Sequence, residues 1–92
     1  MATKSRLKHL SSTVFVCLAI LNRFAEPVSL DEIVIEYEEM FDISRRSICT
    51  YLNRVQHLGF IQSHNAGTKD VTWEITNDGQ IELQWWKDMI NE

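Results

Sequence analysis

The sequence has little of what many small proteins use for covalent or metal cross-linking. It carries two cysteines, Cys17 and Cys49, one proline and three glycines in 92 residues. The two cysteines follow no Cys-x-x-Cys or Cys/His spacing, which argues against a disulfide framework and against a zinc site. Both thiols are predicted to be reduced. Cys17 is expected in the core and Cys49 as a partly buried thiol, with a redox role as its alternative.

Long hydrophobic runs are also missing. The longest covers residues 14–21 and stops at Asn22 and Arg23, far short of the roughly 20 apolar residues that span a bilayer. No small-x-small cleavage site follows the basic start, so the sequence does not indicate a secretory signal. With 45% apolar residues, the chain is expected to form a single cytoplasmic domain over residues 1–92, with no membrane partner.

The sequence offers no recognisable constellation for catalysis. The three histidines, His9, His57 and His64, lie in no metal-ligand motif, and no nucleophile stands at a familiar spacing from a base. We therefore expect no catalytic residues, no metal site and no cofactor, and the chain is not predicted to be an enzyme.

Whole segments lack charge of one sign, although the net charge is −4. Residues 1–25 and 43–69 each carry four basic residues and no acid, and residues 26–42 carry seven acids and no base. Residues 70–92 hold six acids and one lysine. Because exposed charges separated by more than a Debye length of about 8 Å barely interact, the local sign at a binding surface matters more than the total. Residues 43–69 can therefore face a polyanion.

Residues 45–58 have the pattern of a capped amphipathic helix. Ser44 can accept hydrogen bonds from the first turn, and Gly59 supplies a left-handed stop. One side is apolar and the other is polar and free of acids, which is typical of a helix that reads DNA. The predicted core positions are Ile48, Leu52 and Val55, flanked by Tyr51 and Leu58, and the predicted outer positions are Arg46, Cys49, Thr50, Asn53 and His57.

Periodicity and turn residues predict the other elements. Residues 1–10 are expected to form a basic extension and residues 13–26 a helix that ends before Pro27, although the helical spacing of Leu7, Leu10 and Val14 also allows an earlier start or a short preceding helix. Ser29 and Glu32 form a capping box, with Glu32 reaching back to the cap N–H, that opens an acidic helix over residues 30–41. A hairpin over residues 60–76 should bury Trp73, and a last helix covers residues 79–91. The expected buried stripe of the acidic helix is Leu30, Ile33, Val34, Tyr37 and Met40.

Two short motifs connect these elements to a known fold. The first is Ile43-Ser44-Arg45-Arg46-Ser47-Ile48, followed by Leu52, Leu58, Gly59, Phe60 and Ile61, and the second is Trp73-Glu74-Ile75-Thr76-Asn77-Asp78-Gly79. Together they resemble the recognition helix and the wing end of winged helix-turn-helix transcription regulators, especially the MarR-like and IclR-like groups. The resemblance covers roughly residues 13–80. It implies a mostly helical α+β fold with three core helices, a two-stranded wing and a C-terminal helix.

The leading hypothesis is a transcription regulator that binds double-stranded DNA sequence-specifically, with helix 45–58 in the major groove. Arg45 and Arg46 in its first turn can reach guanine edges or phosphates, and Thr50 and Asn53 can contact bases. The predicted positioning contacts to the DNA backbone are Ser44, Ser47, Arg54, His57 and the wing residue Lys69.

The last helix carries two apolar stripes, which is more than one small domain face usually covers. We therefore expect a homodimer through this helix, and the alternative is that the domain absorbs the whole helix. The predicted dimerisation residues are Leu7, Leu10, Ile81, Trp85, Trp86, Met89 and Ile90.

A second hypothesis keeps the fold but changes the partner, since fold alone does not decide function. A winged-helix protein-interaction module, such as an antirepressor, an inhibitor or an assembly subunit, would hold a protein through the acidic helix 30–41 or through Trp85 and Trp86. The acidic total favours this module, whereas the acid-free segment 43–69 favours DNA.

Overall fold

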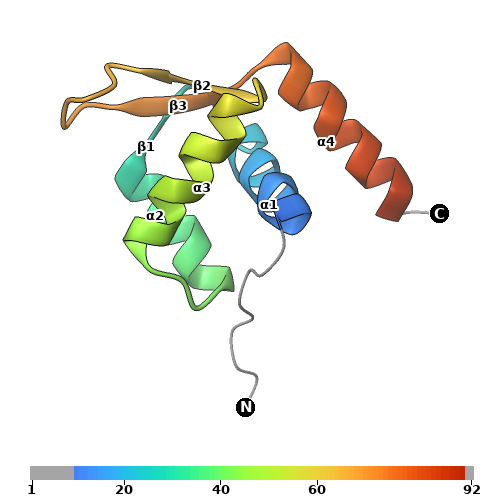
Figure 1. The fold of residues 1–92 in the computed structure, drawn as a ribbon, viewed down its shortest axis with the longest axis horizontal. Coiled ribbons are helices and arrows are strands. Elements are labelled where there is room, and N and C mark those ends of the chain that lie inside the picture. Colours follow the sequence, from blue (N-terminus) through green and yellow to red (C-terminus); the bar gives the residue numbers. More distant parts are fainter. Residues whose placement is uncertain (1–9, 91–92) are drawn as a thin grey trace.

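The computed structural model describes residues 10–90, and their helices surround one side of a small sheet (Figure 1). Helix α1 spans Leu10–Asn22, α2 spans Leu30–Met40, α3 spans Arg45–His57 and α4 spans Asn77–Ile90. The strands are β1 at Val28–Ser29, β2 at Ile61–His64 and β3 at Thr72–Ile75. The basic extension at residues 1–9 lies outside the described residues.

The sheet has three antiparallel strands in the order β1-β3-β2. The hairpin β2–β3 pairs Ile61 with Ile75 and His64 with Thr72, as expected of a wing. The sequence did not predict β1, which pairs Val28 with Trp73. This short strand lies between α1 and α2 in the chain, so it attaches the start of α2 to the base of the wing.

The core lies between the three helices α1, α2 and α3 and the inner face of the sheet. Each helix contributes residues at helical spacing, and the strands contribute Val28, Ile61 and Trp73. Burying one aliphatic side chain of this size contributes about 1.5–3 kcal/mol, so the shared core is what holds the elements together. The fully buried members of the helices include Leu18 and Ile20 in α1, Ile33 and Tyr37 in α2, and Ile48, Leu52 and Val55 in α3.

Both predicted N-caps are present. The Ser29 hydroxyl accepts from the Glu32 backbone N–H at 3.3 Å, and the Ser44 hydroxyl accepts from the Ser47 backbone N–H at 3.1 Å. The Glu32 carboxylate differs from the prediction, because it accepts the Ser29 hydroxyl at 3.3 Å instead of reaching the cap N–H. At the end of α3, Gly59 has φ +87°, the left-handed conformation that glycine adopts without strain.

Two residues predicted to be in the core, Met40 and Leu58, are exposed because they lie at helix ends. Met40 is 42% exposed, because α2 ends at this residue and the next side chain, Phe41, packs against Tyr37 with ring centroids 6.4 Å apart. Leu58 is 48% exposed, because it is the C-cap of α3 and the chain turns at Gly59. Helix α1, described as Leu10–Asn22, ends four residues before the expected residue 26, and its presence at Leu10 agrees with the earlier start that the spacing from Leu7 allowed.

The second sequence motif forms the junction between the wing and α4. The Thr76 hydroxyl donates to the Gly59 carbonyl at 2.7 Å and accepts from the Gly79 N–H at 3.1 Å. The Thr76 N–H donates to the Phe60 carbonyl at 2.9 Å. Gly79 is buried so tightly that a Cβ there would collide with the Phe60 carbonyl oxygen and lie 2.7 Å from Ile75 Cγ1. This motif therefore fixes where α4 leaves the domain.

Gly79→Ala is expected to destabilise the domain by about 1–3 kcal/mol, because the added methyl group overpacks against backbone that cannot move freely. A loss of stability would be diagnostic of close packing, because a glycine-to-alanine change inside a helix normally stabilises the helix by up to about 1 kcal/mol. Urea unfolding measures the difference. Gln80→Ala, at the neighbouring exposed position, serves as the control and should change stability little. A Gly79→Ala protein as stable as wild type would contradict the close packing around Gly79.

Candidate nucleic-acid interface

The outer face of α3 is a polar surface of exposed side chains. Arg46, Thr50, Asn53, Arg54 and His57 are all exposed, and Ser47 and Cys49 are half-buried. Full burial of Ile48, Leu52 and Val55 on the opposite side sets the rotation of the helix. The core therefore determines which side chains α3 presents to a partner.

Some side-chain hydroxyl groups in the first turns of α3 already form hydrogen bonds within the helix. The Ser44 hydroxyl caps the helix and lies 3.0 Å from the Ser47 hydroxyl, and the Thr50 hydroxyl donates to the Arg46 carbonyl at 3.1 Å. A hydroxyl that donates within the chain keeps lone pairs for a ligand. Arg46 is exposed and forms no ion pair with another of residues 10–90.

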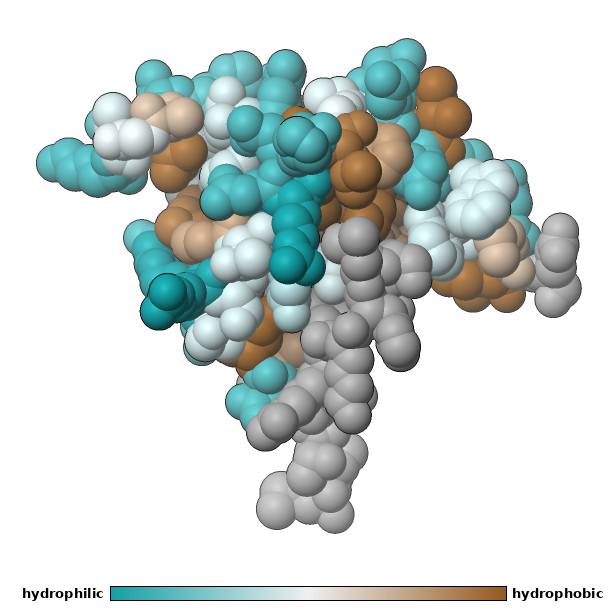
Figure 2. All heavy atoms as spheres, viewed as in Figure 1, coloured by the Kyte–Doolittle hydropathy of each residue, from teal (hydrophilic) through white to brown (hydrophobic). Residues whose placement is uncertain are grey.

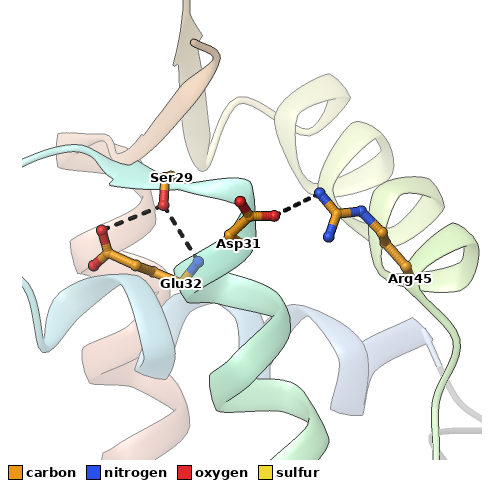
Figure 3. Close-up of polar contacts among 4 residues, drawn as sticks. All are labelled: Ser29, Asp31, Glu32 and Arg45. Carbon is orange, nitrogen blue, oxygen red and sulfur yellow. Dashed lines mark hydrogen bonds and ion pairs between the residues drawn. The ribbon is translucent and has the colours of Figure 1, made fainter. Parts of the chain in front are cut away.

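Arg45 differs from Arg46, because its Nη2 lies 2.7 Å from Asp31 Oδ1 (Figure 3). Asp31 stands in the first turn of α2. Both side chains are mostly exposed, and such ion pairs stabilise a fold by no more than about 1 kcal/mol. Nothing in the sequence pattern paired these two residues, which are 14 positions apart.

The remaining acids of α2 point to other neighbours or to solvent. Glu36 pairs with Arg23, just after the end of α1, at 3.0 Å. Glu38 and Glu39 are exposed in the last turns of the helix. Asp31 pairs with the start of α3, and its negative charge changes the electrostatics of that end.

The wing tip is a tight turn that carries Lys69. The Thr68 hydroxyl donates to the Asn65 carbonyl at 2.7 Å and accepts from the Asp70 N–H at 3.2 Å. Asn65 and Gly67 have positive φ values of 59° and 83°, which suit these residue types. Lys69 is exposed and is the one Lys or Arg in residues 60–76.

The outer face of the wing sheet holds a polar cross-strand cluster. His64 Nε2 lies 2.6 Å from Glu74 Oε1, and the Gln62 side-chain amide donates to the same oxygen at 2.7 Å. The hydrogen bonds from His64 and then Gln62 hold the pKa of the Glu74 carboxyl below its usual value. These three side chains therefore form their hydrogen bonds with one another across β2 and β3.

Two hollows lie beside α3 and the wing. The first, of about 260 Å³, has Cys49, Asn53 and Gln56 of α3 on one side and Trp73 of the wing on the other. The second, of about 270 Å³, is a cleft between the starts of α2 and α3 and the wing tip. The cleft brings together Ser29, Leu30, Asp31, Arg45, Thr68, Lys69 and Val71. Arg45 and Lys69, far apart in sequence, thus line one concave surface.

The two cysteines occupy the environments that their patterns indicated. Cys17 is fully buried, and burial raises the pKa of its thiol to about 12. Burial likewise raises the pKa of the Tyr37 phenol. Cys49 is half-buried. Both thiols are free, and no three His, Cys, Asp or Glu side chains within residues 10–90 gather as metal ligands.

Helix α4 forms a second candidate surface. Leu83 is buried, and Trp86 packs against Phe15 of α1 with ring centroids 6.0 Å apart. Other apolar residues of the helix stay exposed, and Figure 2 shows separate brown patches on the right-hand part of the molecule, with white and teal surface between them. The exposed apolar residues of α4 are Ile81, Trp85, Met89 and Ile90. Within the described part of the chain, these four side chains are therefore not covered by the domain core.

Two predicted dimerisation residues cannot be placed in this surface. Leu7 lies outside the described residues, and Leu10 begins α1 with a side chain outside the described ones. Trp86 belongs with the intramolecular contacts, because it packs on Phe15 and its indole N–H donates to Glu82 at 3.0 Å. Trp85 meets the edge of Trp86 at 5.2 Å and 84°, an arrangement that aromatic rings favour.

These elements define a winged helix-turn-helix fold: three core helices, a β-hairpin wing joined by a short third strand, and a C-terminal helix. No protein-family model and no curated protein sequence matches the chain. Among solved structures, the chain is similar to a PadR family transcription regulator from hypervirulent Clostridium difficile. The TM-score is 0.71 at 18% sequence identity, and the match covers 84% of each chain.

At this identity the likeness shows the fold. The predicted winged-helix architecture is confirmed. The narrower likeness to the MarR-like and IclR-like groups stays a prediction, because the matching structure is named for a different family. Within the part of the chain that the structure describes, no helix has both the length and the apolar content needed to cross a bilayer.

Proposed function

We propose that the chain is a transcription regulator that binds double-stranded DNA and places α3 in the major groove. The observation that carries this proposal is the outer face of α3, which is exposed and lies in a segment without carboxylates. The name of the similar structure, a transcription regulator, supports the same function. Two free thiols also suit a reducing compartment such as the cytoplasm.

Arg46 and Asn53 are the proposed base-reading residues. They are seven positions apart on the same exposed side of α3, which is about 10 Å along the helix and close to the rise of three base pairs. Arg46 can bind a guanine edge with two donors, and Asn53 can pair with an adenine edge. Arg54, His57 and Lys69 would reach phosphates, which position the protein without reading sequence.

A homodimer is the second part of the proposal. Ile81 and Trp85 keep 63% and 52% of their surface exposed on α4, and large apolar residues at such positions are common centres of interfaces. A monomer with so few cations would bind DNA weakly, whereas a dimer reads two half-sites at once. The proposed dimer surface lies on α4 and the proposed DNA-reading face lies on α3.

A protein-interaction module remains the second candidate. Ile35 on α2 is 58% exposed and lies near the acidic residues Glu38 and Glu39 in sequence. A basic protein surface with an apolar centre would fit this side of the helix. Both candidates share the fold, so a direct binding measurement must separate them.

The deciding experiment is salt-dependent binding to a mixed pool of DNA duplexes, followed by sequencing of the bound fraction. DNA reading predicts enrichment of a palindromic site, because two symmetric α3 helices would contact two half-sites. Phosphate contacts also predict that the affinity falls steeply as salt rises. If the protein binds no DNA even at low salt, the DNA proposal is wrong and the protein-interaction module is favoured.

Arg46→Ala is expected to weaken binding to the selected site by about 1–3 kcal/mol per half-site, because a two-donor contact to guanine is lost. Folding should be unaffected, since Arg46 is exposed. Fluorescence anisotropy on selected and random duplexes measures both effects. Lys87→Ala, which removes an exposed cation from α4, is the control and should leave specificity unchanged.

Two results would revise the role of Arg46. Equal weakening on selected and random DNA would make it a phosphate contact. Unchanged binding on both would overturn the assignment of α3 as the reading helix.

A further inference from the structure

The Asp31–Arg45 ion pair lies inside the cleft between α2, α3 and the wing tip. Asp31 Oδ1 accepts from Arg45 Nη2 at 2.7 Å (Figure 3). Lys69 lines the same cleft of about 270 Å³. With α3 in the major groove, as proposed, the sugar-phosphate strand that borders this groove would pass close to the first turn of α3 and the wing. This cleft is therefore where a DNA phosphate would approach Arg45.

Local structure holds both members of the pair in place. Ser29 caps α2 and also pairs with Thr72 in the sheet, so the start of α2 is tied to the wing. Ser44 caps α3 directly before Arg45. The carboxylate of Asp31 also suits the first turn of a helix, where the helix dipole favours negative charge. The ion pair therefore joins two helix starts that are already ordered.

The charge of Asp31 affects different DNA groups unequally. A phosphate that approaches Arg45 meets the nearby carboxylate and is repelled, by about 1 kcal/mol for two unit charges 4 Å apart in water. A neutral acceptor on a base edge feels much less repulsion. Arg45 has five N–H donors and the Asp31 contact uses one of them, so the other donors remain for a base.

We propose that Asp31 is a specificity-determining residue that discourages Arg45 from binding backbone phosphates and so suppresses binding to non-target DNA. Asp31 acts through Arg45 and does not itself contact the bases. The proposal rests on the DNA-binding function proposed above. It gives a role in discrimination to the α2 carboxylate that pairs with Arg45, although the negative charge of this carboxylate opposes phosphate binding.

The test measures binding to a short mixed-sequence duplex for wild type, Asp31→Asn, Arg45→Gln and the double variant. Asp31→Asn should bind about two- to fivefold tighter, the range expected from an exposed ion pair. Its plot of log affinity against log salt should be steeper by about 0.9, corresponding to one added phosphate contact. The double variant should bind no more tightly than Arg45→Gln alone.

Glu39→Gln is the matched control. It removes the same charge from an exposed position of α2, about 12 Å along the helix from Asp31 and beyond the Debye length at physiological salt. It should leave affinity and salt slope unchanged at that salt. Circular dichroism of each variant checks that α2 keeps its helical content.

The outcomes separate the two proposals. If wild type binds DNA and Asp31→Asn binds equally or more weakly, the role of Asp31 is wrong and DNA binding stands. If the gain persists without Arg45, or if Glu39→Gln shows the same gain, the effect is one of total charge and the proposal also fails. If no variant binds DNA at low salt, the proposed function fails together with this inference.

Discussion

The Trp73→Ala variant is expected to lose about 3–5 kcal/mol of stability, the usual cost of removing a large aromatic side chain from a core. Trp73 is 8% exposed and sits in the central strand β3, opposite Val28 of β1 and Ser63 of β2. Its loss would leave a cavity where all three strands meet the helical core. Urea unfolding followed by circular dichroism measures the change.

Trp73→Phe is the graded control for this experiment. It keeps an aromatic ring and removes the indole N–H, which is buried without a hydrogen-bond partner among the described residues. Removing an unsatisfied buried donor offsets part of the lost packing, so this variant should be clearly more stable than Trp73→Ala. A Trp73→Ala protein that unfolds at the wild-type urea concentration would place Trp73 outside the core.

The Ile81→Ala/Trp85→Ala variant is expected to be monomeric and to bind its selected DNA site about 100-fold more weakly or worse, since linked half-sites bind far more tightly than one. Both side chains are exposed on α4, so the change should leave the helical content intact. Trp86 is left in place because it packs against Phe15 within the chain. Sedimentation and DNA titration of the same samples measure both effects.

Gln84→Ala provides the control on the same helix. Gln84 is exposed and its side chain donates to Asp88 at 2.9 Å. Its replacement by alanine should change neither assembly nor DNA binding. A wild-type protein that is monomeric at high micromolar concentration would end the dimer proposal. A monomeric double variant that binds DNA as tightly as wild type would show instead that assembly and DNA binding are independent.

Local sequence signals determined much of the fold. Ser29 and Ser44 accept from nearby backbone N–H groups, and Gly59 takes a positive φ, so short stretches of chain were enough to predict these helix ends. The apolar repeat in residues 45–58 likewise predicted Ile48, Leu52 and Val55 as core residues, and all three are fully buried. Their burial also placed Arg46 and Asn53 outside, because a helix has fixed periodicity.

Tertiary structure decided the features that depend on residues far apart in the chain. A two-residue strand such as β1 carries too little pattern to be recognised, and it forms because β3 offers an unpaired edge. The contact between Asp31 and Arg45 depends on how α2 packs beside α3, which no local spacing specifies. In the same way, both stripes of α4 were apolar in sequence, and packing against α1 decided that Trp86 is half-buried while Trp85 is exposed. Periodicity indicates which residues share a helix face, but only the neighbouring elements determine which face is covered.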